Sequence, residues 1–459
     1  MIRFCNLYLP IRLAAIALVD SVVILLVALA ALRLTGNTAG AGAPVHYAMA
    51  AAASCGVLLC FFVFDLYDLD AVHRWRDALR QSLRAVGAVL AAPIVLALWI
   101  APSSASLRAL EVDTLALIAA VCGLRAISER VQRFAAPGDR VLLVGSDPII
   151  QMIADVMRRR PSVPFRLRGV VMAEEGKAPA DLLFAMCGQT GELASVVEAT
   201  RAERVAVSAE AAASLRPSDL LDLRRKGAHV EDAQALYESM TGRVPVNLLD
   251  PRRLCYGRSL AQGESMLAFS RFAGAVMAAL LLIAISPLLA AIALAIKIGS
   301  PGPVFYRQER VGLGGRTFPV LKFRSMRADA EKLSGPVWAT QRDPRVTRVG
   351  AVLRKLRLDE LPQLWNVLRG EMAFIGPRPE RPNFVAMLAK EIPFYDLRHT
   401  IRPGITGWAQ VCAGYGATVD ESSEKLEFDL FYLKNRSLAL NALVAVKTIK
   451  IMLCGKGAR

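Results

Sequence analysis

The chain has 459 residues, of which 54% are hydrophobic, and a mean hydropathy of +0.39. This length fits two or three domains, and the hydropathy is high for a soluble protein and indicates membrane segments. The formal charge of +16 would favour nucleic acid in a soluble protein, but anionic lipid and phosphorylated substrates compete as explanations in a membrane protein. We expect no nucleic-acid partner, because no recognition-helix or zinc-finger pattern occurs.

The eight cysteines and four histidines lack metal-ligand spacing, which argues against zinc and against a disulfide framework.

Four apolar runs follow one another within residues 1–135, at 13–34, 45–66, 83–101 and 110–127. Each is close to the ~20 residues that a helix needs to cross hydrocarbon. The first run is too long for a signal peptide and lacks a small-residue cleavage pattern. Arginines follow the second and fourth runs, whereas the other two loops carry none or only Arg108. The positive-inside rule therefore predicts a four-helix membrane bundle with both ends in the cytoplasm.

Residues 136–262 have the composition of a soluble domain in which strands and helices alternate. Stretches such as "RVLLVG" and "RVAVSA" predict buried strands, and "QMIADVMRRR" and "DLLDLRRKG" predict helices. This alternation predicts a doubly wound parallel sheet. The G-x-G-x-x-G pattern of dinucleotide-binding folds is reduced to Gly145, so we interpret the module as a degenerate, CoA-binding-like Rossmann domain. A membrane-bound nucleotide-sugar oxidoreductase or dehydratase that uses this module is the competing interpretation.

A fifth apolar segment, residues 268–298, is long enough to span a membrane but has basic residues at both ends. Arg258 and Arg271 lie near its start, and six lysines and arginines lie between 307 and 327. A full crossing would place that second group outside the cell, against the positive-inside rule. Ser286 and Pro287 lie at the midpoint, where proline bends a helix sharply. We predict a re-entrant helix that enters and leaves on the cytoplasmic face, with Ser286 as a partner for freed carbonyls. A kinked spanning helix is the alternative.

The stretch "RKLRLDELPQLWNVLRGEM", residues 354–372, places two adjacent carboxylates, Asp359 and Glu360, among basic side chains. Pro362 is tolerated only near a helix start, so this acidic pair should lie in or just before the first turn of a helix that ends at Gly370. Adjacent helical residues point about 100° apart. The two acids therefore cannot oppose each other as acid and base, but they can share a phosphate, one as nucleophile and one as ligand of a divalent cation. Charge pairing on a solvated surface is the alternative.

Several basic side chains are suited to hold phosphate beside the acidic pair. A guanidinium can bind phosphate through two parallel hydrogen bonds, and phosphoryl transfer depends mainly on positioning and on neutralising charge. The candidate phosphate-binding residues are Lys322, Arg324, Arg354, Arg378 and Arg381.

Five motifs in residues 263–459 occur together in one known family. They are "SPGPVFYRQERVG" (300–312), "LKFRSM" (321–326), "LDELPQLWNVLRGEM" (358–372), "FIGPRPERP" (374–382) and "RPGITGWAQV" (402–411). On these motifs the chain closely resembles the bacterial sugar transferases, which are monotopic polyisoprenyl-phosphate hexose-1-phosphate transferases, or phosphoglycosyl transferases. The four-helix bundle and the Rossmann-like module resemble those of the long-form members from exopolysaccharide clusters.

The resemblance implies a reaction that composition alone does not indicate. A UDP-sugar would donate hexose-1-phosphate to undecaprenyl phosphate and release UMP, as the first membrane step of exopolysaccharide, capsule or O-antigen synthesis. Asp359 would attack the sugar-linked phosphate and form a covalent aspartyl phosphosugar, and Glu360 would help to hold Mg²⁺.

The resemblance also extends to the surrounding positions. Arg354 and Arg378 match phosphate-binding arginines of the family, and Lys322 matches a basic residue near the active site. Ser286–Pro287 matches the break in the re-entrant helix. Arg357 is a departure, because many members have a small hydroxyl residue there that could cap the helix.

The expected fold class is a membrane α-helical bundle, an α/β Rossmann-like domain, and an α+β monotopic catalytic domain, residues 263–459, with a re-entrant helix. The expected location is the bacterial inner membrane, as a multi-pass protein with its catalytic domain on the cytoplasmic face. The expected partners are a UDP-sugar, undecaprenyl phosphate and membrane lipids. A non-catalytic assembly protein that keeps the fold is the remaining alternative.

Two further C-terminal features leave alternatives open. Residues 437–457 are predicted to form either an amphipathic helix at the membrane interface or a core helix of the catalytic domain. Trp408 is predicted to be either a substrate-side residue or a packing residue. The sequence also leaves open which hexose is transferred, whether the protein is a homo-oligomer, and what the Rossmann-like domain does.

Overall fold

The computed structural model describes residues 2–4, 7–9, 19–26, 30, 123, 138–159, 165–172, 186–189, 192–249, 264–327, 345–414 and 418–454. Contacts divide the chain into two compact units, Met1–Phe4 with Tyr8–Leu236 and Cys5–Leu7 with Tyr237–Arg459. Two short strands, β1 (Ile2–Phe4) and β2 (Leu7–Leu9), pair with each other. Residues 19–26 of the first predicted membrane run are helical. Nearly all the rest of the predicted four-helix bundle lies outside the described residues.

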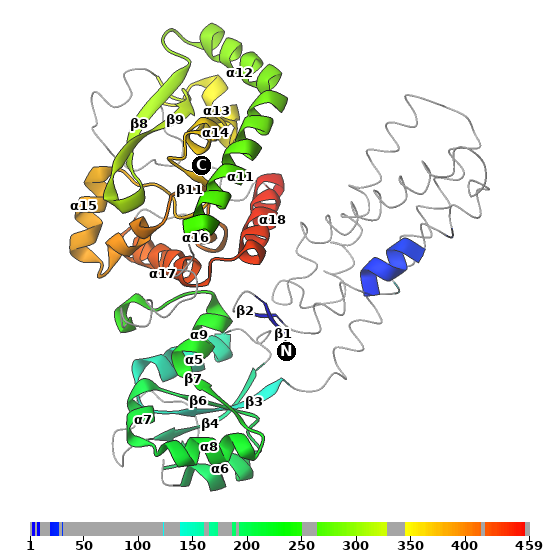
Figure 1. Ribbon diagram of the computed structural model, residues 1–459, viewed down its shortest axis with the longest axis vertical. Coiled ribbons are helices and arrows are strands. Elements are labelled where there is room, and N and C mark those ends of the chain that lie inside the picture. The colour runs from blue at the N-terminus through cyan, green and yellow to red at the C-terminus, as the bar shows by residue number, and fades with distance from the viewer. Residues whose placement is uncertain are drawn as a thin grey trace. The chain divides into compact units, whose positions relative to one another are not determined.

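The Rossmann-like prediction for the first unit is supported by a five-stranded parallel sheet (Figure 1). Its strand order is β5-β4-β3-β6-β7, so the chain leaves β3 first toward one edge and later toward the other. The short strand β5 was not predicted. The strands are β3 (Asp139–Val144), β4 (Phe165–Met172), β5 (Met186–Gln189), β6 (Arg204–Val207) and β7 (His229–Asp232), and the helices are α5 (Pro148–Arg159), α6 (Leu193–Thr200), α7 (Ala209–Ser214) and α8 (Pro217–Arg225).

Gly145 marks the point where the strand order reverses, which is where doubly wound sheets bind ligands. A side chain at this position would meet Ser208 Oγ at 2.2 Å, and Gly145 has a φ of +133°. Ser208 follows β6, is fully buried, and accepts a hydrogen bond from the amide of Ala211 at the start of α7. The side chain of Ser208 therefore takes the space beside Gly145, which favours a packing role over the oxidoreductase interpretation.

The second unit begins at Tyr237, inside α9 and upstream of the boundary predicted at residue 263. It contains an antiparallel hairpin, β8–β9, and a parallel pair, β10–β11. Its elements are α9 (Ala233–Thr241), η2 (Val246–Leu248), α11 (Glu264–Ala284), α12 (Ser286–Gly299), β8 (Phe305–Val311), η3 (Leu313–Gly315), β9 (Thr317–Phe323), α13 (Arg348–Lys355), η4 (Leu358–Glu360), α14 (Gln363–Leu368), β10 (Ala373–Ile375), α15 (Pro382–Glu391), η5 (Tyr395–Thr400), β11 (Gly404–Thr406), α16 (Trp408–Cys412), α17 (Val419–Asn435) and α18 (Leu438–Cys454).

The fifth apolar segment folds as two helices, α11 and α12, which meet at an angle at the end of the second unit away from α17 (Figure 1). The break lies directly before Ser286, and Ser286 Oγ donates to the carbonyl of Ile283 at 2.8 Å. Both the break and its hydroxyl partner were predicted. Within the described part of the chain, one stretch is long and apolar enough to cross a membrane. It is Leu267–Ala284 in α11, with a mean hydropathy of 2.0.

The largest core of the second unit forms around α17 and includes residues from α16 and α18. Trp408 is buried there and donates from Nε1 to the carbonyl of Gly242 at 2.9 Å, which identifies it as a packing residue. Leu440 of α18 is fully buried in this core, whereas Ile449 and Met452 are exposed. The helix therefore uses one face for the core and leaves apolar side chains on another.

Gly350 in α13 sets how closely this helix approaches the chain that follows β9. A Cβ atom at Gly350 would lie 1.9 Å from the carbonyl oxygen of Ser325. The amide of Thr347 already donates to that oxygen, and Thr347 also caps α13 through its side chain. Because α13 leads directly into the acidic pair, this contact fixes the position of the chain that enters the candidate site.

Gly350→Ala should lower the free energy of unfolding by about 1–3 kcal/mol, the usual cost of overpacking, although alanine is intrinsically the better helix former by ~1 kcal/mol. Gly274→Ala in α11 is the matched control, since nothing lies within 4 Å of a Cβ there. Thermal unfolding of both variants in detergent provides the measurement. Equal behaviour of the two variants would contradict the close packing at Gly350.

Candidate active site

Lys322 reaches the acidic pair from the β8–β9 hairpin. It lies on β9 opposite Tyr306 of β8, and its Nζ donates to Glu360 Oε1 at 2.9 Å. Successive side chains on a strand point to opposite faces. The next residue, Phe323, accordingly packs in a core cluster with Ile292 and Ile296 of α12. The hairpin therefore presents a lysine to the second acid while anchoring itself on the broken helix.

The acidic pair lies in the 3₁₀ turn η4, directly before α14, as the position of Pro362 predicted. Arg357 opens this turn with φ 58° and ψ 18°, in the left-handed region, and no side chain caps the turn. A residue other than glycine costs roughly 1–2 kcal/mol in that conformation. After α14, Gly370 adopts a φ of 76° at the predicted C′ position. The chain therefore enters the acidic pair through a strained residue, which is a common feature of functional sites.

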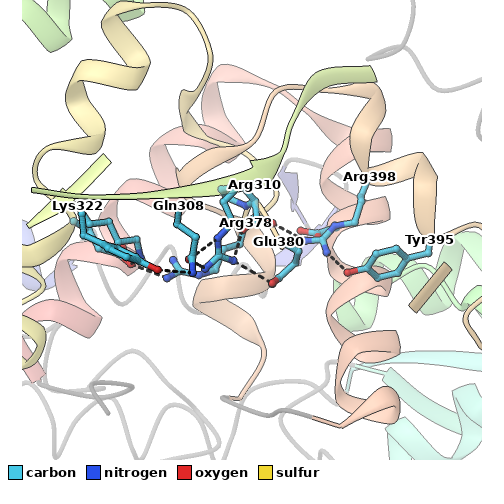
Figure 2. A network of polar contacts seen from close by, with 11 residues as sticks. Gln308, Arg310, Lys322, Arg378, Glu380, Tyr395 and Arg398 are labelled. Atoms are coloured by element: carbon cyan, nitrogen blue, oxygen red, sulfur yellow. Dashed lines mark hydrogen bonds and ion pairs between the residues drawn. The ribbon is translucent and has the colours of Figure 1, made fainter. Parts of the chain in front are cut away.

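Arg378 approaches the same carboxylate from the proline-rich loop, residues 376–382, which joins β10 to α15. Its Nη2 donates to Glu360 Oε1 at 2.6 Å. One carboxylate oxygen therefore receives a lysine from a hairpin and an arginine from a loop. Figure 2 shows the polar network that runs from Lys322 past Arg378 and on through Arg310 and Glu380 toward Arg398 and Tyr395.

These contacts determine the protonation of Glu360. Burial alone would raise its pKa, but Arg378 and Lys322 outweigh burial and hold the pKa well below the usual range. Burial lowers the pKa of Lys322; Glu360 opposes this, and the nearby charges of Arg378 and Arg310 add to it. Since several cations share few acids here, the site favours an additional anion such as phosphate.

Asp359 has a different environment from its neighbour. Its residue is 9% exposed, and burial together with the charge of Glu360 raises its pKa, while Lys322 and Arg354 act in the opposite direction. Within the described residues, no hydrogen bond or ion pair engages its carboxylate. Its oxygens are therefore more basic than those of Glu360 and are available to form a bond.

Arg354 and Arg381, both predicted phosphate ligands, lie at two different helix ends. Arg354 is partly buried in the last turn of α13, its charge acts on Asp359, and its guanidinium forms no ion pair with any described residue. Arg381 occupies the N-cap position of α15, and its charge contributes to the lowered pKa of Arg310. The structure thus places Arg354 beside the nucleophile candidate and Arg381 at the end of the proline-rich loop.

Arg324 does not fit its predicted phosphate-binding role. Its guanidinium donates to the carbonyls of Ser300 and Pro301 at 2.7 and 2.8 Å, and to the hydroxyl of Ser300 at 2.8 Å. These residues follow the end of α12, so the arginine satisfies carbonyls there. The basic residue two positions after Lys322 is therefore structural.

Sequence reasoning missed four charged residues that support the site: Arg310, Glu380, Arg398 and Asp429. Arg310 donates to the carbonyl of Pro379 at 3.0 Å and pairs with Glu380. Arg398 and Asp429 form an ion pair at 2.8 Å and are 6% and 2% exposed. The one available signal was Asp429 within the apolar run "EFDLFYL", since a buried charge needs a partner. That run does not indicate which residue the partner is.

The second unit matches a known family over most of its length. The model of the family described as bacterial sugar transferase matches residues 265–455. A UDP-N-acetylgalactosamine-undecaprenyl-phosphate N-acetylgalactosaminephosphotransferase from Aeromonas hydrophila is 49% identical over 223 residues, 48% of this chain and 52% of that protein. A UDP-glucose:undecaprenyl-phosphate glucose-1-phosphate transferase from Klebsiella pneumoniae is 32% identical over 338 residues, 71% of this chain and 70% of that protein. The chain belongs to the bacterial sugar transferase family.

A third relative shows how the family match is distributed. An exopolysaccharide production protein from Rhizobium leguminosarum is 41% identical over 182 residues, which make up 38% of this chain but 91% of that protein. The chain spans about half the length of the Aeromonas phosphotransferase. The shared region is therefore almost the whole of one relative and only part of others.

Asp359→Asn should raise the melting temperature at pH 7–8 by roughly 2–4 °C. A pKa raised in the folded state means that ionisation destabilises the fold, so the gain should shrink as the pH falls below that pKa. Glu360→Gln is the matched comparison with the opposite sign. Its lowered pKa contributes stability above the unfolded-state value, and this contribution is lost as the pH falls. Thermal scans between pH 4 and 8 test both, and shifts of the same sign would refute the assigned environments.

Proposed function

We propose that this protein transfers hexose-1-phosphate from a UDP-sugar to undecaprenyl phosphate and releases UMP. The observation that carries the proposal is that the two adjacent acids have different contacts. Glu360 is held by Lys322 and Arg378, whereas Asp359 is buried beside them with no hydrogen bond or ion pair to any described residue. Family membership and the names of the relatives support the same reaction.

Asp359 is the proposed nucleophile. A carboxylate oxygen of Asp359 attacks the phosphorus bonded to the sugar, the bond between this phosphorus and the oxygen bridging the two phosphates breaks, and UMP leaves with that oxygen. A phosphate oxygen of undecaprenyl phosphate then attacks the aspartyl phosphosugar. This second step forms a diphosphate link to the lipid and restores the carboxylate. The raised pKa of Asp359 supports the assignment, because a more basic carboxylate is the better nucleophile.

The surrounding cations are proposed to hold the phosphates. Charge develops on the transferred group and on the leaving phosphate, so preformed donors there lower the barrier. Arg354 is suited to this role because none of the described residues forms an ion pair with its guanidinium. Lys322 and Arg378 both contact Glu360, and together they place two positive charges beside the acidic pair. Arg381 is the proposed fourth contributor, from the end of the loop.

The donor set fits Mg²⁺ only if substrate oxygens complete it. The described residues contain no group of three or more histidine, cysteine, aspartate or glutamate side chains that could enclose a metal ion. Mg²⁺ is commonly held by one or two carboxylates together with phosphate oxygens and water. Glu360 offers a second oxygen, Oε2, beside the Oε1 that Lys322 and Arg378 occupy. When bound there with the substrate, Mg²⁺ would neutralise phosphate charge.

We place the protein in the bacterial inner membrane, as a multi-pass protein with its second unit on the cytoplasmic face. The broken helix supports this, because its outward side chains are large and apolar. They include Phe269, Phe272, Val276, Met277, Leu280, Ile283, Leu288, Leu294 and Ile298. Basic residues flank both ends of the segment, so a re-entrant path satisfies the positive-inside rule and a crossing does not. The lipid phosphate and the soluble nucleotide sugar would then meet at the interface.

The sugar is proposed to be a hexose or N-acetylhexosamine, and the product is proposed to enter exopolysaccharide synthesis. The relatives are named for N-acetylgalactosamine and for glucose, and one is named for exopolysaccharide production. UDP-N-acetylgalactosamine and UDP-glucose are therefore the first donors to compare.

Purified protein should release UMP from one of these donors when Mg²⁺ and undecaprenyl phosphate are present. Asp359→Asn should reduce this release by roughly 10³-fold or more, as expected when a nucleophile is removed. Release of UMP is followed with a coupled luminescence assay. Asp420→Asn, at the exposed start of α17, is the matched control and should keep full turnover.

Two outcomes would contradict the assignment. Turnover by Asp359→Asn near the unmodified level would rule out Asp359 as the nucleophile. Full turnover in excess EDTA would rule out a requirement for Mg²⁺. An unmodified protein that binds NAD tightly and releases no UMP from either donor would instead favour the oxidoreductase interpretation.

A cysteine introduced at Pro301, two residues after α12, should react only with a thiol reagent that has access to the cytoplasm. The expectation follows from re-entry, because both ends of the broken helix then lie on one side. A second cysteine introduced at Ser265, near the start of α11, is the control and should show the same sidedness. Labelling of intact cells and inverted vesicles with a membrane-impermeant maleimide, in a background without the native cysteines, makes the comparison. Opposite sidedness at the two positions would establish a spanning helix.

A further inference from the structure

The proline-rich loop that carries Arg378 has almost no hydrogen bonding of its own. Prolines at 377, 379 and 382 lack an amide hydrogen. Four successive carbonyls of the loop instead accept hydrogen bonds from other elements. The pairs are Pro377 with the amide of Gly404 at 2.9 Å, Arg378 with Arg398 Nη2 at 3.0 Å, Pro379 with Arg310 Nη1 at 3.0 Å, and Glu380 with the amide of Val311 at 2.9 Å.

The carbonyl of Arg378 therefore depends on a side chain, Arg398 of η5. Arg398 Nη2 donates to that carbonyl and lies 2.8 Å from Asp429 Oδ2 of α17, while Nη1 donates to the hydroxyl of Tyr395 at 2.6 Å. In Figure 2, Arg398 and Tyr395 form the end of the network opposite Lys322, with Arg378 between them. A guanidinium suits this position because its donors form a rigid fork that serves several acceptors at once.

This ion pair is costly for a structural element. Arg398 is 6% and Asp429 2% exposed. Burial raises the pKa of Asp429 to about 6 although Arg398 opposes the rise. Replacing a buried ion pair with apolar side chains of similar size is often neutral or stabilising. A purely structural account therefore leaves the pair without a clear benefit, whereas the contact with the loop provides one.

Resting on the proposed function, we propose that Arg398, held in place by Asp429, is a positioning residue that fixes Arg378 against Glu360 and the substrate phosphates. The backbone of Arg378 accepts the hydrogen bond from Arg398, and the side chain of Arg378 donates to Glu360. Arg398 thus acts through Arg378 and needs no contact with substrate itself. An error of about 1 Å in such a group can cost roughly 10²-fold in rate.

The double replacement Arg398→Met with Asp429→Leu tests the proposal, because it removes the donor to the loop without leaving an unpaired buried charge. We expect its melting temperature to stay within a few degrees of the unmodified protein and its kcat/KM for UMP release to fall about 10- to 100-fold. In an Arg378→Ala background the same double replacement should cause no further fall, since Arg398 acts only through Arg378.

Lys434→Gln is the matched control. It removes a second, partly buried ion pair of α17, in which Lys434 Nζ contacts Glu238 at 2.7 Å, and it does not touch the loop. We expect it to lower the melting temperature and to show no coupling with Arg378→Ala. An unchanged kcat/KM in the Arg398→Met, Asp429→Leu protein would overturn the proposal, as would an equal fall with and without Arg378.

Hydrogen exchange measured by mass spectrometry separates this proposal from the proposed function, because it needs no turnover. The amides of Gly376, Val311 and Gly404 form the backbone hydrogen bonds that attach the loop to its neighbours. In the double replacement, exchange in peptides that contain these three amides should accelerate at least about tenfold while α17 stays protected. If the double replacement does not fold, Arg398→Lys keeps a charge beside Asp429 but loses the fork, and the same selective acceleration is expected. Uniform acceleration, or none at these three amides, would reject a positioning role. Absence of UMP release from the unmodified protein would reject only the proposed reaction.

Discussion

The second unit is organised around one carboxylate oxygen, Glu360 Oε1, which receives Lys322 and Arg378 from separate parts of the chain. A buried acid held by two cations stays ionised at neutral pH, and its partners must approach within hydrogen-bonding distance from fixed directions. That requirement explains why a hairpin, a 3₁₀ turn and a proline-rich loop converge there. It also separates the two acids, because Lys322 and Arg378 both contact Glu360, whereas no described residue forms a hydrogen bond or ion pair with Asp359.

The same region carries features that lower stability. Arg357 is held in a left-handed conformation, Asp359 is buried with a raised pKa, and Lys322 is partly buried beside two arginines. Each would be relieved by a simple substitution, which is typical of sites where function and stability conflict. The structure around the site compensates through close backbone packing, such as α13 against the chain after β9 at Gly350. The site is therefore maintained by its surroundings together with the contacts of Lys322 and Arg378 with Glu360.

Features that depend on a few neighbouring residues were predictable from the sequence. Pro362 and Gly370 indicated where α14 lies, and Ser286 and Pro287 indicated the helix break. The alternation of predicted strands and helices indicated the parallel sheet. Contacts between distant segments were not predictable. Arg324 and Lys322 both looked like phosphate ligands, yet β9 ends before Arg324, and the carbonyls that follow α12 give Arg324 a structural role. Arg398 contacts Asp429 and the loop only through tertiary folding, and no local pattern encodes those partners.

Three consecutive residues of the chain explain how the proposed membrane depth and the chemistry are connected. Lys322 binds Glu360, Phe323 packs against Ile292 and Ile296 of α12, and Arg324 binds the carbonyls that follow α12. Alternation turns Lys322 and Phe323 to opposite faces of β9, and Arg324 follows the end of that strand. The lysine at the acidic pair therefore cannot shift independently of the broken helix. If α12 rests in the cytoplasmic leaflet, the acidic pair is held at a constant height relative to it. A lipid phosphate at the interface would then always meet Asp359 at the same depth, whichever sugar the nucleotide carries.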